Sequence, residues 1–70
     1  MQLSGVKIVE RDGTPLLLVS RAQHVDIADL HPYLTRRGYV LREGPRPEDV
    51  EDDELGLCEA LWLRRFESVR

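Results

Sequence analysis

The chain has 70 residues, a formal net charge of −3 and one cysteine, with 41% hydrophobic and 33% charged residues. We expect one small globular domain over residues 1–70, because the chain is too short for two domains and too apolar for a disordered segment. A single cysteine excludes an intrachain disulfide and favours a cytoplasmic location, no targeting signal is visible at the N-terminus, and the longest aliphatic run, Leu16–Val19, is too short to cross a membrane.

Residues 6–20 have the pattern of a β-hairpin. The first run, VKIVE, is rich in β-branched residues, and Asp12–Gly13 separates it from the second run, PLLLVS. Asp-Gly between two hydrophobic runs is a strong hairpin signal, since both turn positions take positive φ. The four successive aliphatic residues of the second run predict a strand that is buried on both faces and central in its sheet.

Residues 26–37 predict a first helix. Asp26 is a suitable N-cap and Gly38 a suitable residue after the last turn. One helix face carries Ile27, Leu30 and Leu34. Pro32 leaves two alternatives open, because proline removes a helix hydrogen bond. Either the helix kinks there, or only residues 32–37 are helical, with proline at the first position.

The remainder predicts a strand and a second helix. GYVLRE, at 38–43, has the aromatic and β-branched content of a strand, and GPRP, at 44–47, is a break. A long helix is expected to begin between Pro47 and Asp53 and to run close to Val69. The predicted fold is a small α+β domain of order β-β-α-β-α. Its three-stranded mixed sheet, the hairpin plus a third strand parallel to the second, is packed by two helices.

The expected last helix carries an apolar arc over about half of its circumference, wider than the ~100° that a surface helix needs. One interpretation is a core helix in a very small protein. The other is that part of the arc forms a subunit interface, since a marginal core without disulfides favours association. We expect a homodimer through this helix, or a dedicated protein partner. The predicted interface or core anchors are Leu61, Trp62, Leu63 and Phe66.

The stretch EDVEDDE, at 48–54, contains six acidic residues in seven. Acids in the first turn of a helix are favourable near its N-terminal dipole, but the effect fades within one turn and accounts for about half of them. The residues left as partner-facing charge are Asp52, Asp53 and Glu54. They are suited to a basic protein surface, or to imitation of nucleic-acid phosphates.

The stretch HVDIADLH holds four residues of types found in metal sites and acid–base pairs: His24, Asp26, Asp29 and His31. On one helix the two histidines would lie about 10.5 Å apart along the axis, too far to share an ion. We therefore prefer aspartates that cap the helix and histidines at the surface. No nucleophile motif and no phosphate-binding loop occurs, so we predict no catalytic residue, no metal and no cofactor. The alternative is an oligomeric metal-dependent enzyme that uses His24, Asp26 and His31.

A small basic and aromatic patch is the last feature of note. Its members are Tyr33, Arg36, Arg37, Tyr39 and Arg42. A net acidic chain lacks the usual footprint of nucleic-acid binding, so we prefer arginines that complement the helix C-terminus. The sequence thus predicts a small non-catalytic protein-interaction or regulatory module that binds itself or another protein. The alternative is a regulator acting at nucleic acid, through this patch or by acidic mimicry.

Overall fold

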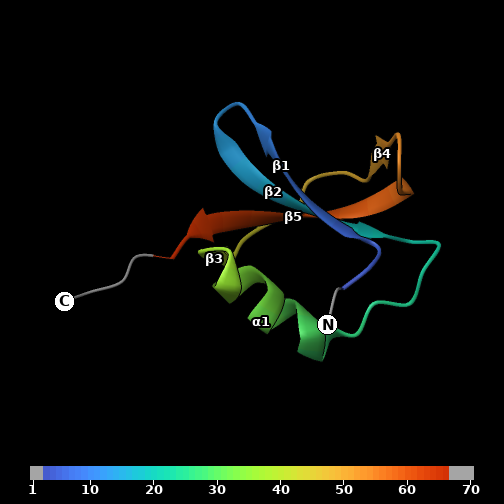
Figure 1. The fold of residues 1–70 in the computed structure, drawn as a ribbon. Helices are drawn as coiled ribbons and strands as arrows, with labels where there is room; N and C mark the ends of the chain where they lie inside the picture. The colour runs from blue at the N-terminus through green and yellow to red at the C-terminus, as the bar shows by residue number, and fades with distance from the viewer. Residues whose placement is uncertain (1–2, 67–70) are drawn as a thin grey trace.

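A computed structural model describes residues 3–66 of the chain, as one helix against a five-stranded antiparallel sheet (Figure 1). The elements are β1 (Val6–Arg11), β2 (Thr14–Ser20), α1 (Ile27–Arg36), β3 (Tyr39–Leu41), β4 (Val50–Asp52) and β5 (Gly56–Arg65). The strand order is β1-β2-β5-β3, and β4 also pairs with β5. The predicted α+β class is therefore right, but the three-stranded mixed sheet and the second helix are wrong. β2 and β3 are not parallel neighbours, because β5 lies between them and pairs antiparallel with both.

The predicted hairpin is confirmed. β1 and β2 pair antiparallel from Val6↔Val19 to Arg11↔Thr14. Both turn residues have positive φ, 53° at Asp12 and 80° at Gly13, as the Asp-Gly signal requires. β2 lies between β1 and β5, and its leucines at 16–18 are at most 1% exposed although they alternate between the two faces. The prediction of a central strand buried on both faces is thus confirmed as well.

The first helix is confirmed in its longer form. The Asp26 carboxylate accepts a hydrogen bond from the Ala28 N–H at 3.0 Å, and Gly38 follows the last turn with φ 86°. α1 continues through Pro32, so the shorter helix that begins at this proline is wrong. Of its apolar residues Leu30 and Leu34 are buried, and Ile27 at the first position is not. Among the described residues, no helix is long and apolar enough to span a membrane.

The predicted last helix is instead β4, a tight turn and β5. The Asp52 carboxylate accepts hydrogen bonds from the N–H groups of Glu54 at 2.9 Å and Leu55 at 3.0 Å, which closes the turn. Gly56 then takes φ 76°, a conformation that glycine adopts at no steric cost. The predicted stretch from Glu67 to Val69 lies outside the described residues. The apolar pattern of residues 55–66 was mistaken for a helix because a strand that is buried on both faces lacks the alternation of apolar and polar residues by which strands are recognised.

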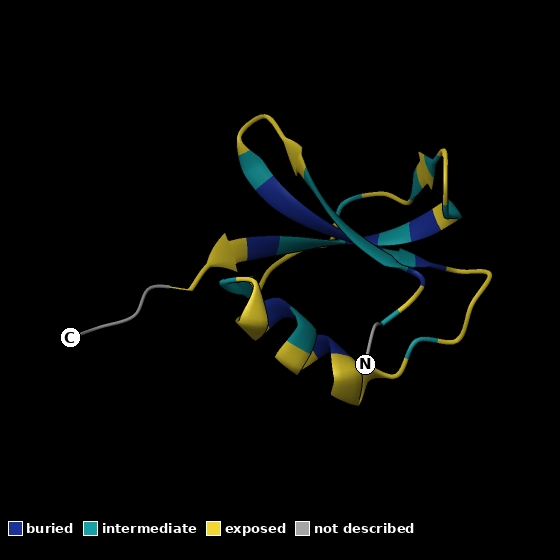
Figure 2. Ribbon diagram, in the orientation of Figure 1, coloured by how far each residue is buried: buried dark blue, intermediate teal, exposed yellow. Residues whose placement is uncertain are grey.

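The core has two clusters of buried side chains, one on each side of the sheet. Figure 2 shows the buried segments on β2, β5 and α1. The helix-side cluster consists of Leu17, Leu30, Leu34 and Leu63. The opposite-face cluster consists of Leu16, Leu18, Cys58 and Ala60. β2 and β5 supply both clusters, since successive side chains of a strand point to opposite faces. These two strands therefore form the centre on which α1, β3 and β4 are placed.

Candidate functional site

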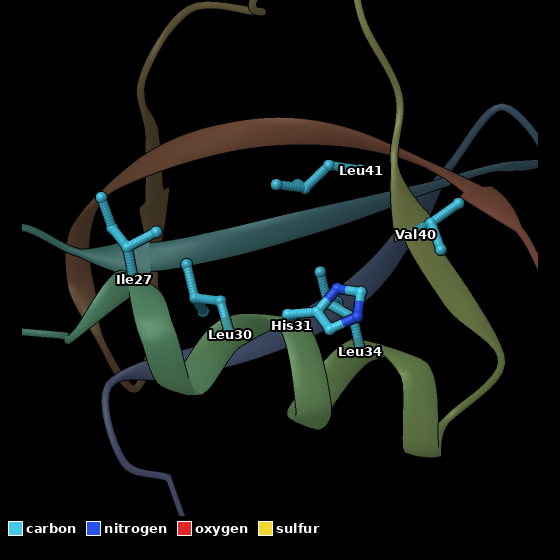
Figure 3. Close-up of a pocket in the computed structure, with 6 residues that line it drawn as sticks. All are labelled: Ile27, Leu30, His31, Leu34, Val40 and Leu41. Atoms are coloured by element: carbon cyan, nitrogen blue, oxygen red, sulfur yellow. The ribbon is translucent and has the colours of Figure 1, made fainter.

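A groove of about 300 Å³ lies between α1 and the edge strand β3 (Figure 3). Its lining residues are Ile27, Leu30, His31, Leu34, Val40 and Leu41. Five of these six are aliphatic, and the helical ones follow the i, i+3, i+4, i+7 spacing that puts them on one face of α1. Ile27 is 79% exposed and Leu41 is 46% exposed, so one end of this face remains uncovered.

Within residues 3–66, β3 presents a free edge beside this groove, because the strand order of the described sheet ends at β3. Two backbone hydrogen bonds flank β3 on its β5 side, from Phe66 N–H to Gly38 C=O at 2.8 Å and from Arg42 N–H to Trp62 C=O at 3.0 Å. Backbone groups along an antiparallel strand point alternately to one neighbour and the other. The N–H and C=O groups of Tyr39 and Leu41 therefore point away from β5, toward the free edge.

Five exposed arginines surround the same end of the molecule. This arginine cluster consists of Arg36, Arg37, Arg42, Arg64 and Arg65. The first two end α1 and the third follows β3. The pairing of β3 with β5 places Arg64 opposite Val40 and Arg65 opposite Tyr39. The sequence predicted the first three as part of a patch, but it missed the last two because they were assigned to a helix.

Two members of the arginine cluster are held by aromatic rings. The Arg37 guanidinium lies 3.8 Å from the centre of the Tyr33 ring and donates a hydrogen bond to the Tyr33 carbonyl at 3.0 Å. Arg65 lies 5.5 Å from the centre of the Tyr39 ring and 3.5 Å from the Glu10 carboxylate. Within residues 3–66 the other three members form no ion pair. They supply positive charge that is not neutralised by the described part of the chain.

The acidic residues gather at the other end of β5. Lys7 Nζ lies 3.0 Å from Asp52 Oδ1 and 2.7 Å from Glu54 Oε1, and Arg21 Nε lies 2.6 Å from Asp49 Oδ2. The hydrogen bonds that Lys7 donates to the carboxylates of Glu54 and Asp52 raise the pKa of Lys7. The hydrogen bond from Lys7, with those from the backbone of the turn, lowers the pKa of Asp52. Of the three carboxylates predicted to face a partner, those of Asp52 and Glu54 are thus paired with Lys7, and Asp53 is exposed.

The predicted hydrophobic anchors do not form one surface. Leu63 is 1% exposed and belongs to the helix-side cluster, against which Leu61 also packs. Trp62 packs against the opposite-face cluster. Phe66, the residue after β5, is half exposed. Leu63 is therefore a core residue, and these four side chains do not share the single helical face on which they were predicted to lie.

The His24 region has the geometry of a helix start. Asp26 caps α1, while His24, Asp29 and His31 are exposed. His31 lines the groove, and its backbone carbonyl accepts a hydrogen bond from the Thr35 hydroxyl at 2.7 Å. Over the described residues no three metal-ligating side chains lie close enough to hold an ion.

Comparison with known proteins gives no relative from which a function could be transferred. No family model, no curated protein and no solved structure matches the chain. The candidate site therefore rests on three neighbouring features of the structure: the apolar groove, the free edge of β3 and the arginine cluster. Sequence reasoning missed the groove because Ile27 was assigned, with Leu30 and Leu34, to one apolar helix face expected to pack on the sheet.

Proposed function

We propose that the chain is a non-catalytic protein-interaction module that binds its partner at the groove between α1 and β3. The observation that carries this proposal is the exposure of Ile27 and Leu41 on the walls of an apolar groove. Single exposed apolar residues are common, but apolar side chains gathered in a concavity are typical of binding sites. No arrangement of nucleophile, base and orienting group is needed for this role.

Self-association through the C-terminal segment is not part of this proposal. β5 is an internal strand, bonded to β2 along one edge and to β3 and β4 along the other. Its side chains fill both core clusters. The surface available for a partner is therefore the groove and the strand edge beside it.

The test is capture by the purified, immobilised chain, followed by reconstitution with the purified partner. Ile27→Glu and Leu41→Glu each place a charge in the groove, and acids are tolerated at the first position of a helix. Leu57→Glu is the matched control, since Leu57 is 47% exposed and does not line the groove. We expect a partner whose affinity falls at least about tenfold, or 1.4 kcal/mol, with either groove variant and stays unchanged with the control. Equal affinity for all four chains would refute the proposed site.

A second candidate function is binding of single-stranded nucleic acid at the arginine cluster. It is favoured by the strand register, which adds Arg64 and Arg65 to the predicted patch. Positive grooves with aromatic side chains are typical of such sites. Retention of an RNA or DNA 20-mer at low salt, lost with Arg42→Ala plus Arg64→Ala, would support it. No retention at low salt would exclude it.

We also propose a cytoplasmic location. Cys58 is fully buried, and burial raises the pKa of its thiol, so the only cysteine serves as a small core residue. This use of cysteine is typical of reducing compartments. Fractionation of cells that carry an epitope-tagged chain would test the assignment, and recovery outside the cytosolic fraction would contradict it.

A further inference from the structure

We infer that the groove and the edge of β3 together take an extended, acidic segment of a partner protein, which adds to the sheet as a strand beside β3. This inference rests on the proposed function and names the chemistry of the partner. Three independent features carry it: the backbone groups of the edge, the shape of the groove and the charge around both.

The backbone of β3 offers hydrogen bonds for one more strand. The N–H and C=O groups of Tyr39 and Leu41 point to the free edge, so an added segment can form up to four bonds with these two residues. In strand addition, main-chain hydrogen bonds provide affinity and pockets for alternate side chains provide specificity. β1, the edge strand at the other end of the sheet, contributes no residue to this groove.

The groove lies where alternate side chains of the added strand would point. Tyr39 packs against the helix-side cluster and Leu41 lines the groove, so side chains on the same face of the added strand would extend over α1 (Figure 3). A volume of about 300 Å³ is at the small end of ligand sites. It accommodates a few aliphatic groups of an extended segment, which would cover Ile27 and Leu41. We therefore assign aliphatic side chains to alternate positions of the bound segment.

The charge around the site favours an acidic segment. Arg42 directly follows β3, Arg64 lies opposite Val40 on the neighbouring strand β5, and Arg36 lies in the last turn of α1. None of the three forms an ion pair among the described residues. Guanidinium groups favour bidentate pairing with carboxylates. A second copy placed by a two-fold axis at β3 would instead bring the two arginine clusters together, which is repulsive. Nucleic acid is less favoured as the occupant, because the Tyr33 ring, which could stack on a base, is covered on one face by Arg37.

The test uses a synthetic nine-residue peptide with two glutamates at each end and a centre that alternates valine or isoleucine with threonine. Its affinity for the full chain is measured by fluorescence anisotropy, beside a peptide in which the glutamates are replaced by lysines. We expect the glutamate peptide to bind at least about tenfold more tightly than the lysine peptide. Arg42→Glu plus Arg64→Glu should reverse this preference, while Leu57→Glu should leave it unchanged.

Two further measurements isolate the strand geometry. Two methylated peptides are compared, one with methyl groups on the odd-numbered backbone nitrogens and one with them on the even-numbered nitrogens. Each removes the hydrogen-bond donors along one edge of the bound strand. The peptide that loses the donors facing β3 should bind at least about tenfold more weakly, and the other should bind unchanged. Amide exchange should show Tyr39 and Leu41 protected by the peptide. The inference is confirmed by both results together. If Ile27→Glu abolishes binding but neither methylated peptide binds more weakly, strand addition is refuted and the proposed function is retained.

Other outcomes also overturn the inference. Tighter binding of the lysine peptide would refute the acidic partner, and a two-fold mass in solution that is lost with Leu41→Glu would identify a second copy as the occupant. Retention of nucleic acid that is lost with Arg42→Ala plus Arg64→Ala would assign the site to that class. If no peptide binds, but a folded partner binds the chain and is lost with Ile27→Glu, the extended segment is refuted and the proposed interaction module is retained.

Discussion

Substitution of Gly56 by alanine distinguishes a turn from a helix at the start of the C-terminal segment, because the two structures predict effects of opposite sign. Gly56 has φ 76°, and an added Cβ would have no heavy atom of residues 3–66 within 4 Å. The cost of alanine is therefore conformational and not steric. In a helix, by contrast, replacement of an interior glycine by alanine stabilises by about 1 kcal/mol.

The expected magnitude follows from these values. A left-handed conformation costs an alanine about 1–2 kcal/mol, and the loss of freedom in the unfolded chain offsets about 0.4–1 kcal/mol of this. We expect Gly56→Ala to lower the free energy of unfolding by about 1 kcal/mol. The two structures thus differ by about 2 kcal/mol, which is a large part of the ~3–5 kcal/mol that stabilises a domain of this size.

Urea denaturation followed by fluorescence measures this difference. Trp62 is the only tryptophan and packs against the opposite-face cluster, so its emission reports loss of the core. With a slope of about 1 kcal/mol per M, the midpoint should fall by about 1 M. Gly13→Ala is the matched control, since its φ is 80° and its Cβ would also meet nothing within 4 Å. If Gly56→Ala raises the urea midpoint while Gly13→Ala lowers it, the turn between β4 and β5 is refuted.

The remaining predictions concern core packing, acid stability and thiol access. Leu63→Ala should cost about 2–4 kcal/mol, a large part of the ~3–5 kcal/mol that stabilises the chain, and lower the urea midpoint accordingly, whereas Leu57→Ala should cost under about 1 kcal/mol; equal costs would contradict the assigned burial. Because the pKa of Asp52 is held below its ordinary 3.8, its contribution to stability is full above that value and is lost as the pH falls through the folded value. The urea midpoint should therefore fall as the pH is lowered below about 4, and less so in Asp52→Asn, while parallel curves would exclude the pair with Lys7. Cys58 should react with a disulfide reagent at least about a hundredfold more slowly in native than in unfolded chain, given a stability of ~3–5 kcal/mol, and a fast native reaction would show that its side of the core is open.

The elements that could be predicted are those with local signals. Asp12–Gly13 sets the hairpin turn through its own conformational preference, and Asp26 caps α1 through a side chain two residues from its donor. Leu16–Val19 predicted a central strand because an unbroken aliphatic run must be covered on both faces. Each of these inferences depends on residues that are close in sequence, and the structure confirms each of them.

The last segment could not be predicted because its structure depends on distant residues. β5 contains leucine, alanine and glutamate, which favour helices, and no β-branched residue. It is a strand because Leu16 to Ser20 of β2 pair along it, with Leu18 opposite Ala60. Tertiary pairing here overrides local preference. The available local signal was Gly56, since a glycine inside a predicted helix costs about 1 kcal/mol.

The candidate site at β3 could not be predicted because the C-terminal segment was assigned to a helix. Arg64 and Arg65 were placed on a helix, so their approach to β3 could not be seen. Ile27 was assigned to a buried face, because a helical stripe indicates direction but not how far the sheet beneath it extends. β3 has three residues, and the groove opens where it ends. The length of an edge strand, which sequence patterns define least well, decides whether the last residue of an apolar stripe is core or binding surface.

Net charge is a poor guide to the partner of this chain. The value of −3 and the acidic stretch pointed to a basic partner, but Lys7 and Arg21 already engage Asp52, Glu54 and Asp49. Asp52 lies opposite Gly56, whereas Arg42 is bonded to Trp62 further along β5 and Arg64 lies two residues beyond. The acids are therefore about 20–26 Å from these arginines, which is roughly two to three screening lengths at physiological salt. A segment bound at β3 would therefore be attracted by the nearby arginines and hardly repelled by the distant carboxylates. For this reason the proposed partner is acidic although the chain is acidic too.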